Sequence, residues 1–328
     1  MKPFLSLTLI LLGLLAILAA CSLGSTSLPF SRVLEGIFRT GTATDAMIIW
    51  DIRLPRALTA WLVGAALAIS GAALQGLLRN PLAEPGVLGV SSSASLGATV
   101  SIYYGFAAGA FWMLPIFAIA GALAATVIIA LASLRTQSVV TLILVGVGLS
   151  GFSGALMSLL MNMAPNPFYL SDMINWMLGS VANRSFRDLA IPAPLLLSGM
   201  VILFFARRGL SVLTLGEEAA SGLGLNLQKQ RLLIVVGTGL ATGAAVALAG
   251  AIGFIGIVVP HLIRPLVSHD PGRALIPSAL AGGLLLVLTD IGVRLLPTLN
   301  ELKLGVVAAL FGAPVFVWIA IRQRSSHV

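Results

Sequence analysis

The sequence predicts an all-α membrane protein: a bundle of about ten helices that cross the lipid bilayer and form one domain over residues 1–328. Hydrophobic residues make up 58% of the chain and charged residues 9%, whereas soluble domains carry about 25% charged residues. The few charges also separate long uncharged runs. Most of these runs approach the roughly 20 residues that a helix needs to cross ~30 Å of hydrocarbon at ~1.5 Å per residue.

The uncharged runs give the predicted spans in chain order. The second run is the clearest, because Arg53 and Arg56 precede it, Arg79 closes it, and a turn-forming segment with two prolines follows at 80–86. The run at 252–268 is short, and Pro260 within it is expected to kink the helix. The predicted spans are residues 4–23, 56–78, 86–106, 111–132, 138–162, 189–206, 232–250, 252–268, 275–293 and 304–321.

Small residues are frequent within these runs and predict close packing of the helices. Gly239 and Gly243 have the small-xxx-small spacing, and rows of Ala, Gly and Ser fill residues 64–76. Such rows let helix backbones approach closely where lipid provides no hydrophobic drive for association. We therefore expect most of the 35 glycines to serve helix packing.

The N-terminal run allows two interpretations. Residues 18–21, Leu-Ala-Ala-Cys, resemble the end of a lipoprotein signal with Cys21 as the lipidated residue. The alternative is a first membrane span, and the length of the run favours it, because signal cores have about 7–15 apolar residues. Cys21 is the single cysteine, so it cannot form a disulfide within the chain.

The distribution of charge predicts the orientation. If residue 1 lies inside the cell, ten spans place eleven of the 19 Lys and Arg residues inside and eight outside. The acidic residues sharpen this contrast, since most of them fall outside. The sign of the bias favours cytoplasmic N- and C-termini. The net charge of +8 is therefore attributed to topology and anionic lipid, and no nucleic-acid partner is expected.

The sequence lacks the residue clusters that an enzyme or an ion-coupled transporter needs. It contains no GxxxxGK[ST] phosphate loop and no HExxH motif, and its three histidines are scattered. We expect no catalytic residue, cofactor or metal ion in this chain, and we expect His261 to be structural. Asp290 is the only acid within a hydrophobic run, and its spacing predicts an i,i+4 ion pair with Arg294.

Several motifs, in order along the chain, resemble the FecCD family. They are RLPR at 53–56, GAALAISGAALQ at 64–75, NPLAEPGVLGVS at 80–91, WMLGS at 176–180, GFIGIVVPHLIR at 253–264 and LGVVAALFGAPVF at 304–316. Members of this family are the membrane subunits of ATP-driven importers for iron-siderophores, haem and cobalamin. The resemblance implies a permease of the bacterial inner membrane that works as a homodimer.

The resemblance also implies partners and a cargo. Two ATPase subunits would bind on the cytoplasmic side and carry the ATP and Mg²⁺, while a periplasmic binding protein would deliver the substrate. We expect an iron-siderophore as the substrate, with cobalamin or haem as the alternative. Two functions of another class stay open at this point: an ion-coupled secondary transporter and a membrane scaffold without a transport role.

The loop at about 207–231 is the candidate contact with the ATPase. Glu218-Ala219-Ala220 followed by Gly224 is similar to the EAA-xxx-G loop of ABC importers, although the later I-x-L-P part is absent after Ile234. Two short helices broken at 222–224 would form the contact. The implied coupling residues are Glu217, Glu218, Ala219, Ala220, Gly222 and Gly224.

The resemblance implies three further sites. The cytoplasmic gate would lie in the loops after the second span and before the fifth, at Asn80, Leu82, Thr136 and Ser138. The translocation path would be lined by the fifth span, at Ser153, Met157, Met161 and Asn162. Docking of the binding protein would use three arginines at outer ends of spans, Arg53, Arg56 and Arg294, because a guanidinium grips a carboxylate with two hydrogen bonds.

Overall fold

The computed structural model describes the whole chain except residues 1–2, 25–26, 137, 298–300 and 325–328. Every regular element within the described residues is a helix, as the composition predicts. In chain order these are α1 (Pro3–Ser22), α2 (Phe30–Phe38), α3 (Ala43–Met47), η1 (Ile48–Arg53), α4 (Leu54–Leu78), η2 (Pro85–Leu88), α5 (Val90–Tyr103), α6 (Phe106–Gly109), α7 (Met113–Arg135), α8 (Val139–Asn162), α9 (Pro167–Met177), α10 (Phe186–Leu189), α11 (Pro192–Phe205), α12 (Arg207–Val212), η3 (Leu213–Leu215), α13 (Glu217–Gly222), α14 (Leu227–Ala249), α15 (Ile255–Ile263), η4 (Arg264–Val267), α16 (Pro271–Leu295) and α17 (Leu304–Arg324).

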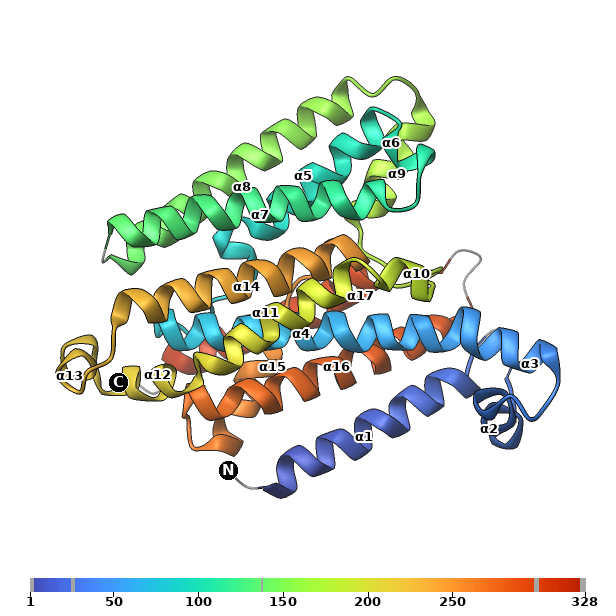
Figure 1. Ribbon diagram of the computed structural model, residues 1–328, viewed down its shortest axis with the longest axis horizontal. Helices are drawn as coiled ribbons and strands as arrows, with labels where there is room; N and C mark the ends of the chain where they lie inside the picture. The colour runs from blue at the N-terminus through green and yellow to red at the C-terminus, as the bar shows by residue number, and fades with distance from the viewer. Residues whose placement is uncertain (1–2, 25–26, 137, 298–300, 325–328) are drawn as a thin grey trace.

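Helix α4 runs through the centre of the bundle, between α14 and α16 (Figure 1). Its contact with α16 depends on glycine. A Cβ placed on Gly64 would lie 2.2 Å from the carbonyl oxygen of Gly282, and one on Gly282 would lie 2.4 Å from the oxygen of Gly64. Trp61, one turn earlier, packs between Gly13 of α1 and Gly283 of α16. The small residues of 64–76 therefore serve close packing, as predicted.

Helix α15 is a short broken element that packs against the middle of α4. A Cβ on Gly71 would lie 1.9 Å from the oxygen of Gly256, so the two backbones touch. Pro260 has no N–H and leaves the carbonyl of Gly256 without its i,i+4 donor. The side-chain amide of Gln75 donates to this oxygen at 3.1 Å, and Arg264 donates to the Gln75 side chain at 2.9 Å.

Helices α5, α7 and α8 form an outer layer beside this core (Figure 1). Helices α5 and α7 touch closely, since a Cβ on Gly97 would lie 2.0 Å from the oxygen of Phe117. Helix α8 covers α5 with one face and exposes the other. The exposed face carries small residues, Gly148, Gly151 and Ala155, and nothing lies within 4 Å of a Cβ placed on either glycine.

All ten predicted spans coincide with helices, but their lengths differ. Six helical segments of the described residues are long and apolar enough to cross a membrane: Phe4–Ser22, Ala43–Leu78, Met113–Arg135, Val139–Asn162, Leu227–Ala249 and Pro271–Leu295. A seventh is Pro192–Phe205 with Arg207–Leu215, a pair bent by 44°. Helix α5 has 14 residues, because η2 takes the start of the predicted run at 86–106, and α15 has nine. These two helices are too short to cross a bilayer alone.

The bundle has two distinct ends. We name the end that carries α13 the coupling end, and the end that carries Arg56, Asp290 and Arg294 the arginine end. The first residues of α1 and the last of α17 both lie toward the coupling end, whereas α2 and α3 cap the arginine end (Figure 1). The start of α1 and the end of α17 thus lie on one side of the bundle, and the compartment that this side faces stays a prediction.

Candidate functional sites at the two ends of the helix bundle

The predicted ATPase contact forms a short, exposed helix at the coupling end. Helix α13 ends in a Schellman motif, in which Leu225 N–H donates to the oxygen of Ala220 and Gly224 N–H donates to that of Ser221. Gly224 has φ +87°, a conformation that side chains disfavour, and nothing lies within 4 Å of a Cβ placed there. The predicted break at 222–224 is therefore present, and its cause is the left-handed glycine.

An ion pair fixes α13 to the bundle. Arg231, buried in the second turn of α14, donates to both carboxylate oxygens of Glu217 at 2.9 and 2.8 Å. Ala220 is fully buried beneath the helix. The remaining predicted coupling residues, Glu218, Ala219, Gly222 and Gly224, are exposed. The segment therefore has a base fixed by an ion pair and an exposed surface of small residues, one carboxylate and the apolar side chain of Leu223.

Both pairs of predicted gate residues lie at this same end. Leu82 N–H donates to the side-chain oxygen of Asn80 at 2.9 Å, and Ser138 N–H donates to the hydroxyl of Thr136 at 3.0 Å. Each pair therefore forms a local turn directly after a membrane-crossing helix. Arg79 next to the first turn donates to the carbonyl of Leu213 at 2.7 Å, which links the turn to the element that precedes α13.

The chain between the first turn and α5 packs on α8. A Cβ on Gly146 would lie 2.2 Å from the oxygen of Val87, so η2 touches the backbone of α8. Glu84 at the start of η2 is a feature that the sequence did not single out. Burial raises the pKa of its carboxyl group, and the backbone N–H of Phe254 opposes this effect by donating to it. The segment after α4 thus contacts both α8 and the start of α15.

The four predicted path residues of α8 do not share one surface. Ser153 is buried, and its hydroxyl lies 3.0 Å from the hydroxyl of Ser93 on α5. Met157 is buried and Met161 half-buried, whereas Asn162 is exposed at the end of the helix. Within one subunit, the exposed face of α8 carries large apolar side chains, among them Leu144, Val147 and Phe152, beside the small residues described above.

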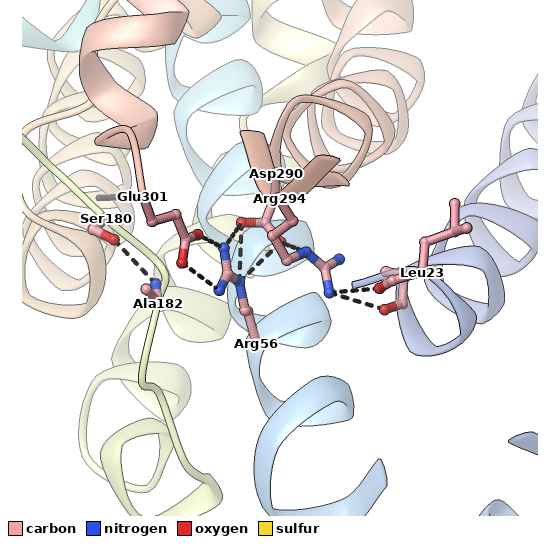
Figure 2. A network of polar contacts seen from close by, with 8 residues as sticks. Leu23, Arg56, Ser180, Ala182, Asp290, Arg294 and Glu301 are labelled. Atoms are coloured by element: carbon pink, nitrogen blue, oxygen red, sulfur yellow. Dashed lines mark hydrogen bonds and ion pairs between the residues drawn. The ribbon is translucent and has the colours of Figure 1, made fainter. Parts of the chain in front are cut away.

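The three predicted docking arginines all make contacts within the chain at the arginine end, and Figure 2 shows those of Arg56 and Arg294. Arg56 of α4 donates to the carboxylate of Asp290 on α16, with its closest nitrogen at 2.7 Å, and also pairs with Glu301. Arg294 pairs with Asp290 at 3.2 Å, which confirms the predicted i,i+4 contact. Asp290 is almost fully buried, whereas Glu301 is exposed.

Two of these arginines also hold the end of α1. Arg53 donates to the carbonyl oxygens of Cys21 and Ser22 at 2.7 and 2.8 Å. Arg294 donates to those of Ala20 and Leu23 at 3.0 and 3.2 Å. The carbonyls at a helix C-terminus have no partner within the helix, and cations there also interact favourably with the helix dipole. Buried Cys21 therefore lies at the end of a helix that two arginines cap.

A polar cavity of about 450 Å³ lies at the arginine end, beneath α9. Two of its lining groups are buried without a hydrogen-bond partner among the described residues, the Nε1 of Trp176 and the Nε of Arg184. Burial lowers the pKa of Arg184, and Asp188 opposes this effect. Among the described residues, no group of three or more His, Cys, Asp or Glu side chains could hold a metal ion.

Comparison with known proteins identifies the chain's relatives. The model of the FecCD transport family matches residues 9–322. The chain is 40% identical over 323 residues to the uncharacterised ABC transporter permease protein YvrB of Bacillus subtilis, covering 94% of this chain and 91% of the relative. It is 41% identical over 283 residues to the vitamin B12 import system permease protein BtuC of Salmonella paratyphi A, covering 86% of each.

The fold agrees with these relatives. A solved structure assigned to the metal-chelate type of ABC transporter, in an inward-facing conformation, superimposes with a TM-score of 0.85 at 31% identity, covering 98% of this chain and 99% of that one. The family match spans nearly the whole chain, and the helices described above form the same fold. The chain therefore belongs to the FecCD transport family and is the membrane-embedded permease of an ABC importer.

Proposed function

We propose that this permease imports a metal chelate across the bacterial inner membrane, with an iron-siderophore as the expected cargo. The observation that carries the proposal is the likeness over almost the full chain to a transporter of the metal-chelate type. Cobalamin is the second candidate, because relatives at 41% identity are named as vitamin B12 permeases. Haem stays a third candidate from the family resemblance alone.

The proposed complex contains two copies of this chain, two ATPase subunits and one periplasmic binding protein. The permease itself has no enzymatic role, and ATP and Mg²⁺ bind to the ATPase. The coupling end faces the cytoplasm in this arrangement, so that both termini are cytoplasmic and the arginine end faces the periplasm. The Lys and Arg bias of the loops supports this orientation.

Helix α13 is proposed to transmit motion between the ATPase and the permease. Its exposed Glu218, Ala219 and Gly222 would enter the ATPase, and the ion pair of half-buried Glu217 with buried Arg231 would transmit the displacement to α14. Both carboxylate oxygens of Glu217 accept from one nitrogen of Arg231, at 2.9 and 2.8 Å, and this contact supports the assignment because it connects α13 to α14.

We also propose where the cytoplasmic gate and the translocation path lie. The turns at Asn80 and Thr136 would close the cytoplasmic exit, since both lie at the coupling end. The path would run along the exposed face of α8, at the two-fold axis between two copies, with Asn162 at its periplasmic mouth. Ser153 and Met157 would then support α8 from behind by packing within the subunit.

Docking of the binding protein is proposed to centre on Arg56. Its partner Asp290 is buried, whereas its second partner, Glu301, is exposed and can be replaced by a carboxylate of another protein. Arg53 and Arg294 would contribute by holding α1 in place. The test is binding of the purified partner to Glu301→Gln and Arg56→Gln variants. Stronger binding to Glu301→Gln and weaker binding to Arg56→Gln are expected, whereas unchanged binding to both variants would remove the assignment.

The transport proposal is tested by reconstitution. The permease is co-expressed with its ATPase, purified through a tag on the permease, and placed in liposomes with the binding protein enclosed on the periplasmic-facing side. ATP-dependent uptake of ⁵⁵Fe-siderophore is then compared with uptake of radiolabelled cobalamin and haem. An ATPase variant that binds but does not hydrolyse ATP is the control. Failure to recover any ATPase, or uptake that persists with the inactive ATPase, would contradict the proposal.

A further inference from the structure

Three arginines surround a small cavity at the coupling end. The cavity has a volume of about 190 Å³ and lies where α12 crosses the start of α16. It is lined by Arg207, Arg208, Ser211, Gly272, Arg273 and Ile276. Arg207 directly follows α11, and Arg273 belongs to the first turn of α16. Helix α16 is long enough to cross the membrane, so its first turn, with Arg273, lies at the depth of the lipid headgroups. Arg207, at the bend between α11 and α12, lies at the same depth because its carbonyl oxygen contacts Gly272.

The walls of the cavity are built by close backbone contact. A Cβ placed on Gly272 would lie 2.1 Å from the carbonyl oxygen of Arg207 and 2.3 Å from the hydroxyl of Ser211. The guanidinium of Arg207 stacks over the ring of Phe204, with its carbon 4.2 Å from the ring centroid. The position of Arg207 is therefore fixed by the bend between α11 and α12 and by an aromatic face, whereas Arg208 and Arg273 extend toward solvent.

The positive charge at this cavity is only partly compensated. Within the described part of the chain, Arg207 and Arg208 have no acidic partner within salt-bridge distance, and Arg273 has one, Asp270 at 3.2 Å. The same carboxylate also accepts from Ser211 at 2.6 Å and from two backbone N–H groups at the start of α16. Asp270 is thus already shared among several donors, and the cavity keeps a net charge of about two positive units.

A second cavity lies next to the first, shares Arg273 with it, and has Ser6 and Ser268 in its lining as well as apolar side chains. Its volume is about 280 Å³, and it lies between α1, η4 and α16. Leu5, Leu266, Val267 and Pro277 provide its apolar lining. A cationic pocket at headgroup depth beside a cavity with an apolar wall has the two chemistries of a single ligand, an anionic headgroup attached to an acyl chain.

We propose that this pair of cavities is a binding site for an anionic phospholipid. The phosphate lies among Arg207, Arg208 and Arg273, and the start of an acyl chain lies against Leu5 and Leu266. Arginine suits this role because its planar guanidinium holds a phosphate with two hydrogen bonds. A bound lipid would join α1, α12 and α16, and α12 leads directly to the coupling helix α13. The site would therefore link the composition of the membrane to the rigidity of the ATPase contact.

The test measures headgroup preference in the intact permease. The protein is purified in detergent, mixed with equimolar dioleoylphosphatidylglycerol and dioleoylphosphatidylcholine, and examined by native mass spectrometry. We expect the wild-type protein to retain the anionic lipid at least tenfold over the zwitterionic one, since each basic residue near an anionic headgroup contributes to binding. The triple variant R207Q/R208Q/R273Q should lose this preference. The control Arg135→Gln removes an exposed charge at the end of α7, outside the cavities, and should keep it.

A second variant tests the cavity without changing its charge. Gly272→Val places a side chain where α12 touches α16, and the expected result is a loss of lipid preference comparable to that of the triple variant. The folded state of each variant is checked by its melting temperature in detergent without added lipid. Should Gly272→Val fail to fold, the three single arginine variants replace it, each with an expected partial loss.

Two other sources of negative charge are distinguished in the same experiment. Inorganic phosphate and glycerol 1-phosphate are added at the concentration of the lipid, and displacement of the lipid by either would assign the site to a free anion. Binding of the ATPase is measured in the absence of lipid. A triple variant that loses the ATPase but keeps the preference for phosphatidylglycerol would assign the arginines to the partner protein. Equal retention of both lipids by the wild-type protein would also overturn the proposal.

Discussion

Asp290 offers a direct test of whether the arginine end holds the bundle together. The Asp290→Asn substitution preserves the shape of the side chain but removes its charge. Asp290 accepts from Arg56 at 2.7 and 3.1 Å and forms an ion pair with Arg294 at 3.2 Å, and its side chain is 2% exposed. Without the carboxylate, two guanidinium groups face each other in a poorly hydrated site. The structure therefore predicts a large loss of stability rather than a local rearrangement.

The magnitude follows from the partners that remain. Breaking a buried ion pair by removing one member costs about 3–5 kcal/mol. The lower end applies here, because Arg56 keeps Glu301 and Arg294 keeps two carbonyl oxygens of α1. A loss of about 3 kcal/mol lowers the melting temperature by roughly 6–12 °C in a chain of this size, at ~2–4 °C per kcal/mol. The change is much larger than the effect of an exposed ion pair, which contributes about 0–1 kcal/mol.

The assay is thermal unfolding of the purified permease in detergent, followed by tryptophan fluorescence. Asp172→Asn is the matched control, since Asp172 is an exposed acid at the same end of the bundle. A double-mutant cycle with Arg56→Met isolates the interaction between Arg56 and Asp290. The double variant should lose less stability than the sum of the losses of the two single variants. If Asp290→Asn melts within 1 °C of both the wild type and the control, the network does not stabilise the fold and the reasoning fails.

Three further predictions concern helix contacts. Gly64→Val should prevent folding or lower the melting temperature by more than 10 °C, because its Cβ would lie 2.2 Å from a backbone oxygen. Gly148→Val, on an open face, should have the melting temperature of the wild type. Gly224→Ala should weaken ATPase binding through backbone strain of roughly 1 kcal/mol, measured by co-purification. Gly109→Ala in α6, with helical backbone, open space around an added Cβ and no place in the proposed ATPase contact, should not weaken it. Gln75→Leu should lower the free energy of unfolding by about 1–3 kcal/mol, because it leaves the carbonyl of Gly256 and the guanidinium of Arg264 without their partner. An unchanged melting temperature would show that water replaces the amide.

The sequence predicted the helices well because lipid imposes a simple rule, in which a run without charge must become a helix. It also predicted the contact between Asp290 and Arg294, since four residues separate them on one helix face. The short helices α5 and α15 were overestimated in length. Apolar composition does not reveal where a proline or a 3₁₀ turn shortens a helix within the protein interior.

Long-range pairing was beyond the reach of sequence reasoning. Arg56 and Asp290 are 234 residues apart, and nothing in the local pattern indicates that α4 and α16 cross where their side chains meet. The sequence placed Arg53 at the end of a span, but it did not indicate that Arg53 binds the carbonyl oxygens of α1. The path residues of α8 were chosen by chemical character, whereas the packing of α5 decides which face of α8 stays open.

The capping of α1 by Arg294 has a consequence for biogenesis. The bond from Arg294 to the oxygen of Ala20 joins residues that are 274 positions apart. Helix α1 is therefore synthesised long before α16 supplies one of the arginines that cap it. At ~5–20 residues per second, the delay is roughly 15–55 s. During that time only one of the two arginines that cap the end of α1 is present. The carbonyl groups at this helix end are then less well satisfied, and the end is more accessible to membrane proteases. Nascent chains halted before residue 294 should accordingly be degraded faster in pulse-chase experiments than chains halted just beyond α16.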